Sequence, residues 1–193
     1  MEVHKFYDNE YSVGILWNMG NKYAREIMLR IAIMEEVVQV KILDLENSYK
    51  QFVLDCYEGD TEAYDGGYIY EKIKNMNANN NRIVAFVLQI DNPTYKKDEN
   101  GKVQCIEARK VKQRIREEYA PKMDSYFFDN LIHISDNVEE ARKTLEVLTK
   151  YRKFTIENYV RKGYKPIIEK FTNNSEQSYT NLLKKLKQDK DER

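Results

Sequence analysis

Of the two histidines in the chain, His133 lies in the sequence context that suits chemistry. It is part of Asn-Leu-Ile-His-Ile-Ser-Asp at 130–136, a short apolar run that predicts a strand leading directly into a helix. The positive N-terminal end of a helix attracts anions such as phosphate and keeps a nearby imidazole neutral, and a neutral imidazole is a nucleophile. The pattern is therefore suited to nucleophilic chemistry at His133 on an anion such as a phosphate. The alternative interpretation is a strand-end histidine that is hydrogen-bonded to a neighbouring carbonyl. His4 is expected to do nothing specific.

A basic run at Arg109–Arg116 carries five positive charges in eight residues. It is interpreted either as a solvated helix face, balanced by three nearby glutamates, or as the wall of a triphosphate site beside His133. Arg116 is the member that we single out. Nucleic-acid binding through this run is disfavoured because the 32 Lys+Arg are balanced by 32 Asp+Glu, which leaves no basic excess.

The elements that must position this site follow a regular order. Hydrophobic periodicity predicts a strand at Tyr11–Trp17, a helix at 22–36, a half-exposed strand at Val37–Leu45, two helical segments within 46–78, a central strand at Ile83–Leu88 that is covered on both faces, a polar loop at 91–101, a helix at 102–119 and a strand at Phe127–Ile134. This order predicts an α+β, ferredoxin-like (βαββαβ) fold with helices on one face of an antiparallel sheet. Alternation in the last strand predicts that Leu131 and His133 share a face.

The helix after His133 has a clear predicted start. Asp-Asn-Val-Glu at 136–139 has the form of a capping box, in which Asp136 accepts a backbone N–H and Glu139 reaches back. The glutamate pairs at 35–36 and 139–140 are predicted to be solvated surface, since adjacent residues on a helix point apart. Beyond this helix the pattern contains no strand signal. We therefore predict one domain at 1–151 and a helical C-terminal extension at 152–193.

Composition excludes several classes of protein. The 193 residues carry zero net charge, and no apolar run approaches the roughly 20 residues of a membrane span. The first residues have no apolar signal-peptide core, so a soluble cytoplasmic protein is expected. Cys56 and Cys105 cannot make a disulfide framework or a four-ligand zinc site, and they are predicted to be small buried or half-buried thiols.

Around His133 the chain resembles the nucleoside diphosphate kinase family, whose catalytic histidine lies in Asn-(Ile/Leu)-(Ile/Val)-His-Gly-Ser-Asp. Every position matches except the glycine, which is Ile134 here. The resemblance covers about residues 10–150 and includes Arg-Glu-Ile-Met-Leu-Arg at 25–30, Cys-Tyr at 56–57, the strand at 83–89, Arg-Ile-Arg-Glu-Glu-Tyr at 114–119 and Val-Glu-Glu-Ala at 138–141.

This resemblance implies the ferredoxin-like fold and a ping-pong reaction. A nucleoside triphosphate carrying Mg²⁺ would transfer its γ-phosphate to His133, and the phosphohistidine would then phosphorylate a nucleoside diphosphate. Family members commonly assemble as oligomers, so a homo-oligomer is implied as well. The other implied site residues are the nucleotide- or phosphate-binding Tyr57, Arg116 and Asn130 and the histidine-orienting Ser135 and Thr144.

The sequence also departs from the family's site. The family's first strand ends in Lys-Pro-Asp-Gly, whose lysine grips the phosphates, but Ile15–Gly20 contains no lysine and Lys22 is too far along. Thr144 stands where the family has an acidic residue that holds the ring. About four extra residues separate Arg116 from Asn130. These departures leave room for another phosphate acceptor, or for a non-catalytic module that keeps the fold for nucleotide binding or assembly.

Overall fold

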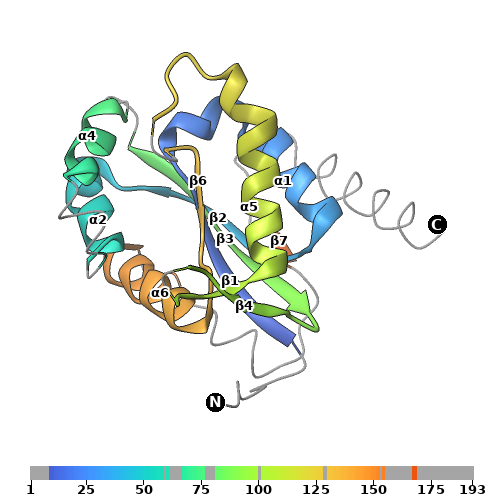
Figure 1. Cartoon of the computed structure of the whole chain (residues 1–193). Coiled ribbons are helices and arrows are strands. Elements are labelled where there is room, and N and C mark those ends of the chain that lie inside the picture. The colour runs from blue at the N-terminus through green and yellow to red at the C-terminus, as the bar shows by residue number, and fades with distance from the viewer. Residues whose placement is uncertain are drawn as a thin grey trace.

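The computed structural model describes residues 9–58, 60, 67–76, 81–99, 101–127, 130–152, 154 and 167–168. His4 and the helices expected within 155–193 lie outside the described residues. Four antiparallel strands form most of the sheet: β1 (Asn9–Leu16), β2 (Glu36–Asp44), β3 (Arg82–Asp91) and β6 (Ile132–Ile134). Helix α1 (Ala24–Met34) connects β1 to β2, and α5 (Ile106–Tyr119) lies between β3 and β6 (Figure 1). The strand order β6-β1-β3-β2 confirms the predicted ferredoxin-like fold.

Strand β3 is the centre of the sheet, as its apolar sequence predicts. It pairs with β1 from Asp91 opposite Asn9 to Val84 opposite Leu16, and with β2 on its other side. The whole of Ile83–Leu88 is buried. A strand with neighbours on both edges and cover on both faces needs an uninterrupted apolar run.

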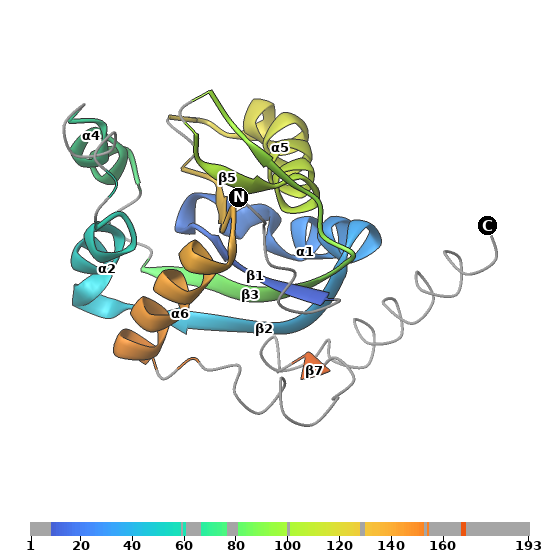
Figure 2. The same ribbon diagram turned by 60° about the horizontal axis from the view of Figure 1, so that its bottom comes forward.

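Helices cover both faces of the sheet, whereas the sequence predicted cover on one face. Helices α1 and α5 pack on one face, which we call the α1/α5 face. The opposite face, the α2/α6 face, is covered by α2 (Tyr49–Cys56), α4 (Tyr68–Asn75) and α6 (Val138–Arg152) (Figure 2). The alternation of apolar residues in β3 requires both layers, because Ala85 and Val87 face one side while Val84 and Phe86 face the other.

A β-bulge in β2 overturns the prediction of a half-exposed strand. Val37 lies opposite Leu88 and Gln39 lies opposite Val87, so Val38 is an extra residue in the pairing. One inserted residue reverses the alternation of the side chains. Val38 consequently joins the core of the α2/α6 face while Val40 joins that of the α1/α5 face, and Gln39 is buried.

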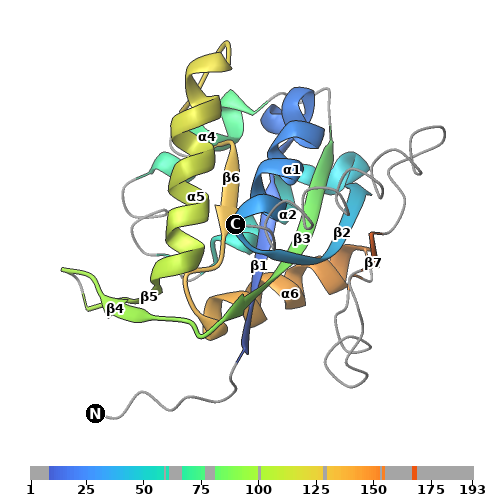
Figure 3. The same ribbon diagram turned by 90° about the vertical axis from the view of Figure 1, so that its right-hand side faces the viewer.

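The predicted polar loop at 91–101 is wrong in part, because two short strands form a hairpin there. β4 (Tyr95–Lys97) pairs antiparallel with β5 (Val103–Cys105), and the turn between them contains Gly101 at φ +79°. Figure 3 shows the hairpin projecting beside the start of α5. Two hydrogen bonds attach it to the start of α6: the Cys105 N–H donates to the Asp136 carbonyl (2.6 Å), and the Asn137 side chain donates to the Val103 carbonyl (2.9 Å).

Helix α6 is capped one residue later than predicted. The Glu140 N–H donates to Oδ1 of Asn137 (2.9 Å), and the Asp136 N–H donates to Oε2 of Glu140 (2.6 Å). The N-terminal cap is therefore Asn137 with Glu140, not Asp136 with Glu139. This shift leaves the Asp136 carboxylate for other partners and turns Glu140 inward.

The remaining described elements are short. Strand β7 (Ile167–Ile168) pairs parallel with Gln39–Val40 of β2, so a strand occurs in the segment for which only helix was predicted. Cys56 is half-buried and Cys105 is buried, both as free thiols, which confirms that prediction. The described residues also form 3₁₀ helices at Asn18–Tyr23, Glu46–Ser48 and Ala120–Lys122.

Candidate functional site

His133 lies in the middle of β6, the short strand at one edge of the sheet. It is paired opposite Ile15 of β1, so its side chain shares the α2/α6 face with that residue, and 15% of the side chain is exposed. Ile132 and Ile134 pack on the opposite, α1/α5 face. Leu131 packs there too, instead of sharing the face of His133, because the regular strand begins only at Ile132.

The outer edge of β6 is covered by cations from α5. Leu131 and Ser135 exchange backbone hydrogen bonds with β1, so the carbonyls of Ile132 and Ile134 point away from the sheet. Nη2 of Arg116 donates to the Ile132 carbonyl (3.0 Å), and Nζ of Lys112 donates to the Ile134 carbonyl (3.2 Å). One positive charge is therefore bound to the residue before His133, and another to the residue after it.

A row of aromatic rings leads from the core to the imidazole. The Trp17 and Tyr57 rings are stacked, with centroids 6.3 Å apart and planes 24° apart. The Tyr57 ring meets the His133 ring edge to face at 6.2 Å. The Lys72 ammonium lies 4.5 Å from the Tyr57 ring centroid and donates a hydrogen bond to the Tyr57 hydroxyl. Tyr57, which the sequence placed near the phosphates, thus contacts both the histidine and a buried cation.

An ionic cluster surrounds the other side of the imidazole at the start of α6. Asp136 accepts from Lys112 at 2.5 Å and from Lys102 at 3.2 Å. Glu140 lies 3.8 Å from the Lys102 ammonium, and its Oε1 atom lies 3.9 Å from Nε2 of His133. Lys102 comes from the β4–β5 hairpin, so four separate elements meet at this point.

These surroundings decide the protonation of His133. Burial lowers the pKa of the imidazole most, and the charges of Lys112, Lys72 and Arg116 lower it further against the opposing charge of Asp136, to about 3. The ring is therefore neutral at pH 7, and one of its nitrogens carries a free lone pair. Burial would raise the pKa of Asp136, but Lys112 and Lys102 hold it below its usual value, so this carboxylate stays charged.

Glu140 has the opposite shift. Burial, followed by the neighbouring charge of Asp136, raises the pKa of the Glu140 carboxyl, although Lys102 opposes that shift. The carboxyl nearest to the imidazole is therefore easier to protonate than a surface glutamate.

Some of the predicted site residues contact the imidazole, whereas the side chains of others bond backbone groups. Tyr57 contacts the His133 ring, and Arg116 binds the neighbouring carbonyl. Asn130 is buried and accepts the Phe127 N–H at 3.3 Å, while its Nδ2 atom has no hydrogen-bond partner within the part of the chain that the structure describes.

Neither of the two residues expected to orient the ring is seen to bond it among the described contacts. Ser135 is buried, and its Oγ accepts the Val13 N–H at 2.9 Å, which joins β6 to β1. Thr144 is buried on α6, one helical turn after Glu140. The carboxyl beside the imidazole is thus one turn earlier on the helix than the sequence resemblance placed it.

Some members of the basic run on α5 lie on a solvated helix face, and others face the strand that carries His133. Arg109, Lys110 and Arg114 are exposed, as expected of a solvated helix face, whereas Lys112 and Arg116 turn toward β6. Sequence reasoning did not single out Lys112, because spacing within a dense run of charges does not show which members face inward.

Two further site residues were missed. Glu140 was assigned to solvated surface together with Glu139, which is wrong for Glu140 because the shifted cap turns it toward His133. Lys72 had a detectable signal. It occupies a position on the buried face of α4, at helical spacing from Ile69 and Met76.

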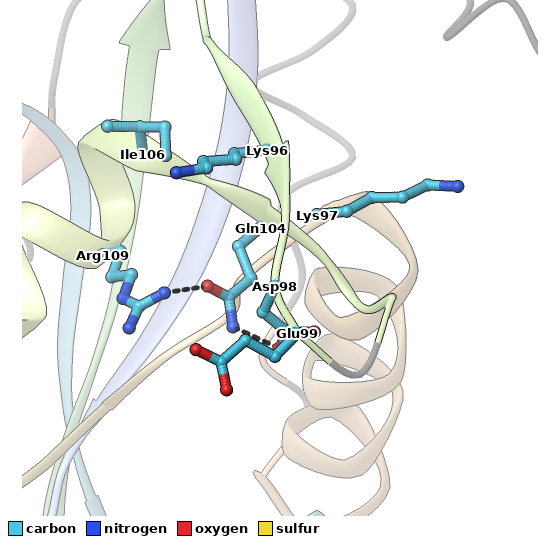
Figure 4. Close-up of a pocket in the computed structure, with 7 residues that line it drawn as sticks. All are labelled: Lys96, Lys97, Asp98, Glu99, Gln104, Ile106 and Arg109. Carbon is cyan, nitrogen blue, oxygen red and sulfur yellow. Dashed lines mark hydrogen bonds between the residues drawn. The ribbon is translucent and has the colours of Figure 1, made fainter.

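A surface pocket lies apart from these residues. It is formed by the β4–β5 hairpin and the first turns of α5, and Figure 4 shows Arg109 bonded to Gln104 within it. Gln104 in turn donates to Asp98 at 3.0 Å. None of the predicted site residues lines it. Its lining residues are Lys96, Lys97, Asp98, Glu99, Gln104, Ile106 and Arg109.

Within the described ranges, no three histidine, cysteine or acidic side chains gather closely enough to hold a metal ion. In the same part of the chain, no helix combines the length and the apolar character that crossing a bilayer requires.

Comparison with solved structures supports the fold. The chain is similar to nucleoside-diphosphate kinase from Borrelia burgdorferi, solved as a transition-state mimic with bound vanadate and ADP, at a TM-score of 0.50 and 13% identity. That alignment covers 89% of this chain and 96% of the kinase. Nucleoside diphosphate kinase from Aquifex aeolicus is similar over 72% of this chain and 94% of its own, with a TM-score of 0.46 and 15% identity. No protein-family model and no curated protein sequence matches the chain. The first of these similarities shows a fold of the nucleoside-diphosphate-kinase type.

Proposed function

We propose that the chain is a phosphotransferase that carries a phosphoryl group on His133 between a nucleoside triphosphate and a nucleoside diphosphate. The observation that carries this proposal is the state of His133: a neutral imidazole, partly exposed, beside three cations and the start of α6. The fold, which is that of a known group of nucleotide kinases, is consistent with this reaction.

The reaction is a double displacement. A ring nitrogen of His133 attacks the γ-phosphorus, an N–P bond forms, and the bond to the β,γ-bridging oxygen breaks with its electron pair leaving on the diphosphate. A terminal oxygen of the acceptor diphosphate then attacks the phosphorus, and the N–P bond breaks to return the neutral imidazole. Mg²⁺ enters as part of the nucleotide substrate and offsets the charge of its phosphates.

The residues of this chain supply the rest of the site. Arg116 would stabilise charge on the transferring group, and Tyr57 and Asn130 would contact nucleotide or phosphate. The Asn130 Nδ2 atom, which has no hydrogen-bond partner among the described residues, supports that role. Ser135 and Thr144 would hold β6 and α6 in place around the ring. The low pKa of His133 leaves a ring nitrogen unprotonated at pH 7, so that nitrogen is available to attack phosphorus.

The test is incubation with γ-labelled ATP and Mg²⁺, comparing the wild type with His133→Ala and with His4→Ala, which removes the other histidine. We expect an acid-labile, base-stable label on the wild type and on His4→Ala, none on His133→Ala, and discharge of the label by nucleoside diphosphates. Label that persists through the chase would show that the acceptor is not a nucleoside diphosphate but another class of compound. Absence of label from the wild type, with nucleotide binding retained, would overturn the proposal in favour of a non-catalytic nucleotide-binding or assembly module.

A further inference from the structure

Lys102 is the side chain through which the β4–β5 hairpin reaches the surroundings of His133. It directly precedes β5, and its ammonium lies 3.2 Å from the Asp136 carboxylate. One oxygen of Glu140, Oε1, lies 3.8 Å from this ammonium and 3.9 Å from Nε2 of the imidazole. A single carboxyl group therefore stands between Lys102 and His133.

The hairpin fixes the backbone of Lys102 on both sides of its side chain. The Lys102 N–H donates to Oδ1 of Asp98 (2.8 Å), and the Asp98 N–H donates to the Lys102 carbonyl (3.0 Å). The carbonyl of the next residue, Val103, accepts from the side chain of Asn137 at the start of α6 (2.9 Å). The stem of the lysine is thus anchored relative to the helix that carries Glu140.

Phosphorylation would change the charge of the His133 ring. One nitrogen of the neutral imidazole uses its lone pair to form the N–P bond, and the other nitrogen keeps its proton, so the ring becomes positively charged. Lys112, Lys72 and Arg116 oppose that charge, as they oppose protonation of the ring. A carboxylate beside the ring offsets them, and Oε1 of Glu140 is close enough to Nε2 to do so when the carboxyl is ionised.

The ionisation of Glu140 depends on the charges that face it. Burial and then the charge of Asp136 raise the pKa of its carboxyl, whereas the charges of Lys102 and Lys112 lower it, that of Lys102 more strongly. The titratable and charged groups around this carboxyl come from different elements. They are Lys102 of the hairpin, Lys112 of α5, His133 of β6 and Asp136 before α6, while Asp60 acts on Lys102 in turn.

We propose that Lys102 is a positioning residue for phosphoryl transfer: it keeps the Glu140 carboxylate charged and in place beside His133, where the carboxylate balances the charge of the phosphorylated ring. This inference rests on the proposed function. The β4–β5 hairpin thereby contributes to the reaction through a lysine that acts by way of Glu140 and not by contact with the reacting atoms.

The test measures the initial rate of labelling by γ-labelled ATP against pH. It compares Lys102→Met and Lys102→Arg with Lys97→Met, a control at an exposed lysine of the same hairpin. Without the Lys102 charge, Glu140 protonates at higher pH, so the acid limb of the profile for Lys102→Met should move up by about one pH unit. His133 itself protonates only near pH 3, below this limb. Lys102→Arg and Lys97→Met should keep the wild-type profile, and all rates should converge at higher pH, where Glu140 is ionised in every variant.

A double-variant cycle separates this role from a structural one. Glu140→Gln removes the titrating carboxyl while it keeps the size of the side chain. In that background Lys102→Met should change the labelling rate no further at any pH. A loss of the same size with and without the Glu140 carboxyl would show that Lys102 acts by another route, and would overturn the inference.

NMR titration of the Glu140 carboxyl carbon tests the same link without turnover. The pKa of Glu140 should be higher in Lys102→Met than in Lys97→Met, while thermal unfolding reports whether each variant is folded. If Lys102→Met does not fold, Lys102→Gln takes its place. An unchanged Glu140 pKa, or an acid limb that does not move, overturns this inference and leaves the proposed function intact. Failure of the wild type to label overturns both.

Discussion

Glu140 holds Oε1 3.9 Å from Nε2 of His133 because its other oxygen, Oε2, is fixed by the backbone N–H of Asp136 at 2.6 Å. One carboxyl group thus caps α6 and faces the imidazole at the same time. This double use links the start of the helix to the orientation of the ring, since a change in the cap would also move the carboxyl that lies beside the ring.

Replacement of Glu140 by alanine should lower the free energy of unfolding by about 1 kcal/mol, because the capping bond is lost. The neighbouring Glu139 is the matched control. It is exposed and pairs with Arg142 on the helix surface, so Glu139→Ala should change stability by less than about 0.5 kcal/mol. Urea unfolding of the two variants checks this. Equal losses of stability would show that the inward cap has no special role.

The neutral His133 should make the protein sensitive to mild acid. Its pKa is about 3 in the folded state and about 6.5 when unfolded, so the unfolded chain binds the extra proton first as the pH falls. The stability due to the neutral ring is complete above about pH 6.5 and is lost progressively toward pH 3. At pH 5 the loss should be about 2 kcal/mol.

This loss is measured as a difference, because Asp136 and Glu140 also take up protons in acid, with a lowered pKa at Asp136 and a raised pKa at Glu140. Denaturant unfolding at pH 7.5 and at pH 5 is compared for the wild type and for His133→Gln. The variant should lack about 2 kcal/mol of the pH dependence. Identical pH dependence in the two proteins would contradict the low pKa.

Asp136→Asn should destabilise the fold by about 3 kcal/mol, because it leaves the ammonium of Lys112 buried without its carboxylate. The side chains of this pair are only 12% and 9% exposed. The exposed ion pair between Asp44 and Arg82 is the control, and Asp44→Asn should cost less than about 1 kcal/mol. The double variant Asp136→Asn/Lys112→Met should recover part of the loss in chemical denaturation. A loss no larger than that of Asp44→Asn would count against a buried pair.

Gly14→Ala should destabilise the sheet by about 2 kcal/mol through steric overlap. Gly14 lies opposite Phe86 in the pairing of β1 with β3, and a Cβ atom at this position would come within 2.1 Å of the phenylalanine ring. The aromatic ring therefore packs directly on the glycine backbone. Adding Phe86→Leu should make the alanine less harmful than it is alone. Additive effects of the two changes in thermal unfolding would rule out this contact as the cause.

The order of elements could be predicted because each depends on a local pattern. The apolar run of β3, the strand-to-helix junction at His133 and the periodicity of α6 are all visible within short segments. The bulge at Val38 is different. It is set by the pairing of β2 with β3, and the residue types of β2 do not show that one of them is extra in that pairing.

The site was less predictable because its charged residues are brought together by tertiary contacts. Lys72, Lys102 and Lys112 come from three different elements, and no spacing in the chain relates them. The one-residue shift of the helix cap shows the limit of motif reading. Asp136 and Asn137 are both good capping residues, and the ion pair with Lys112 decides which of them caps the helix.

The cations at the outer edge of β6 also oppose pairing of this edge with a strand from another molecule. An exposed strand edge offers unpaired carbonyls to a strand from another molecule, which is a common route to aggregation. In this protein the outward carbonyls of Ile132 and Ile134 are already bonded to Arg116 and Lys112, and the strand is only three residues long. The same side chains that place positive charge near His133 therefore make these carbonyls unavailable to a strand from another molecule.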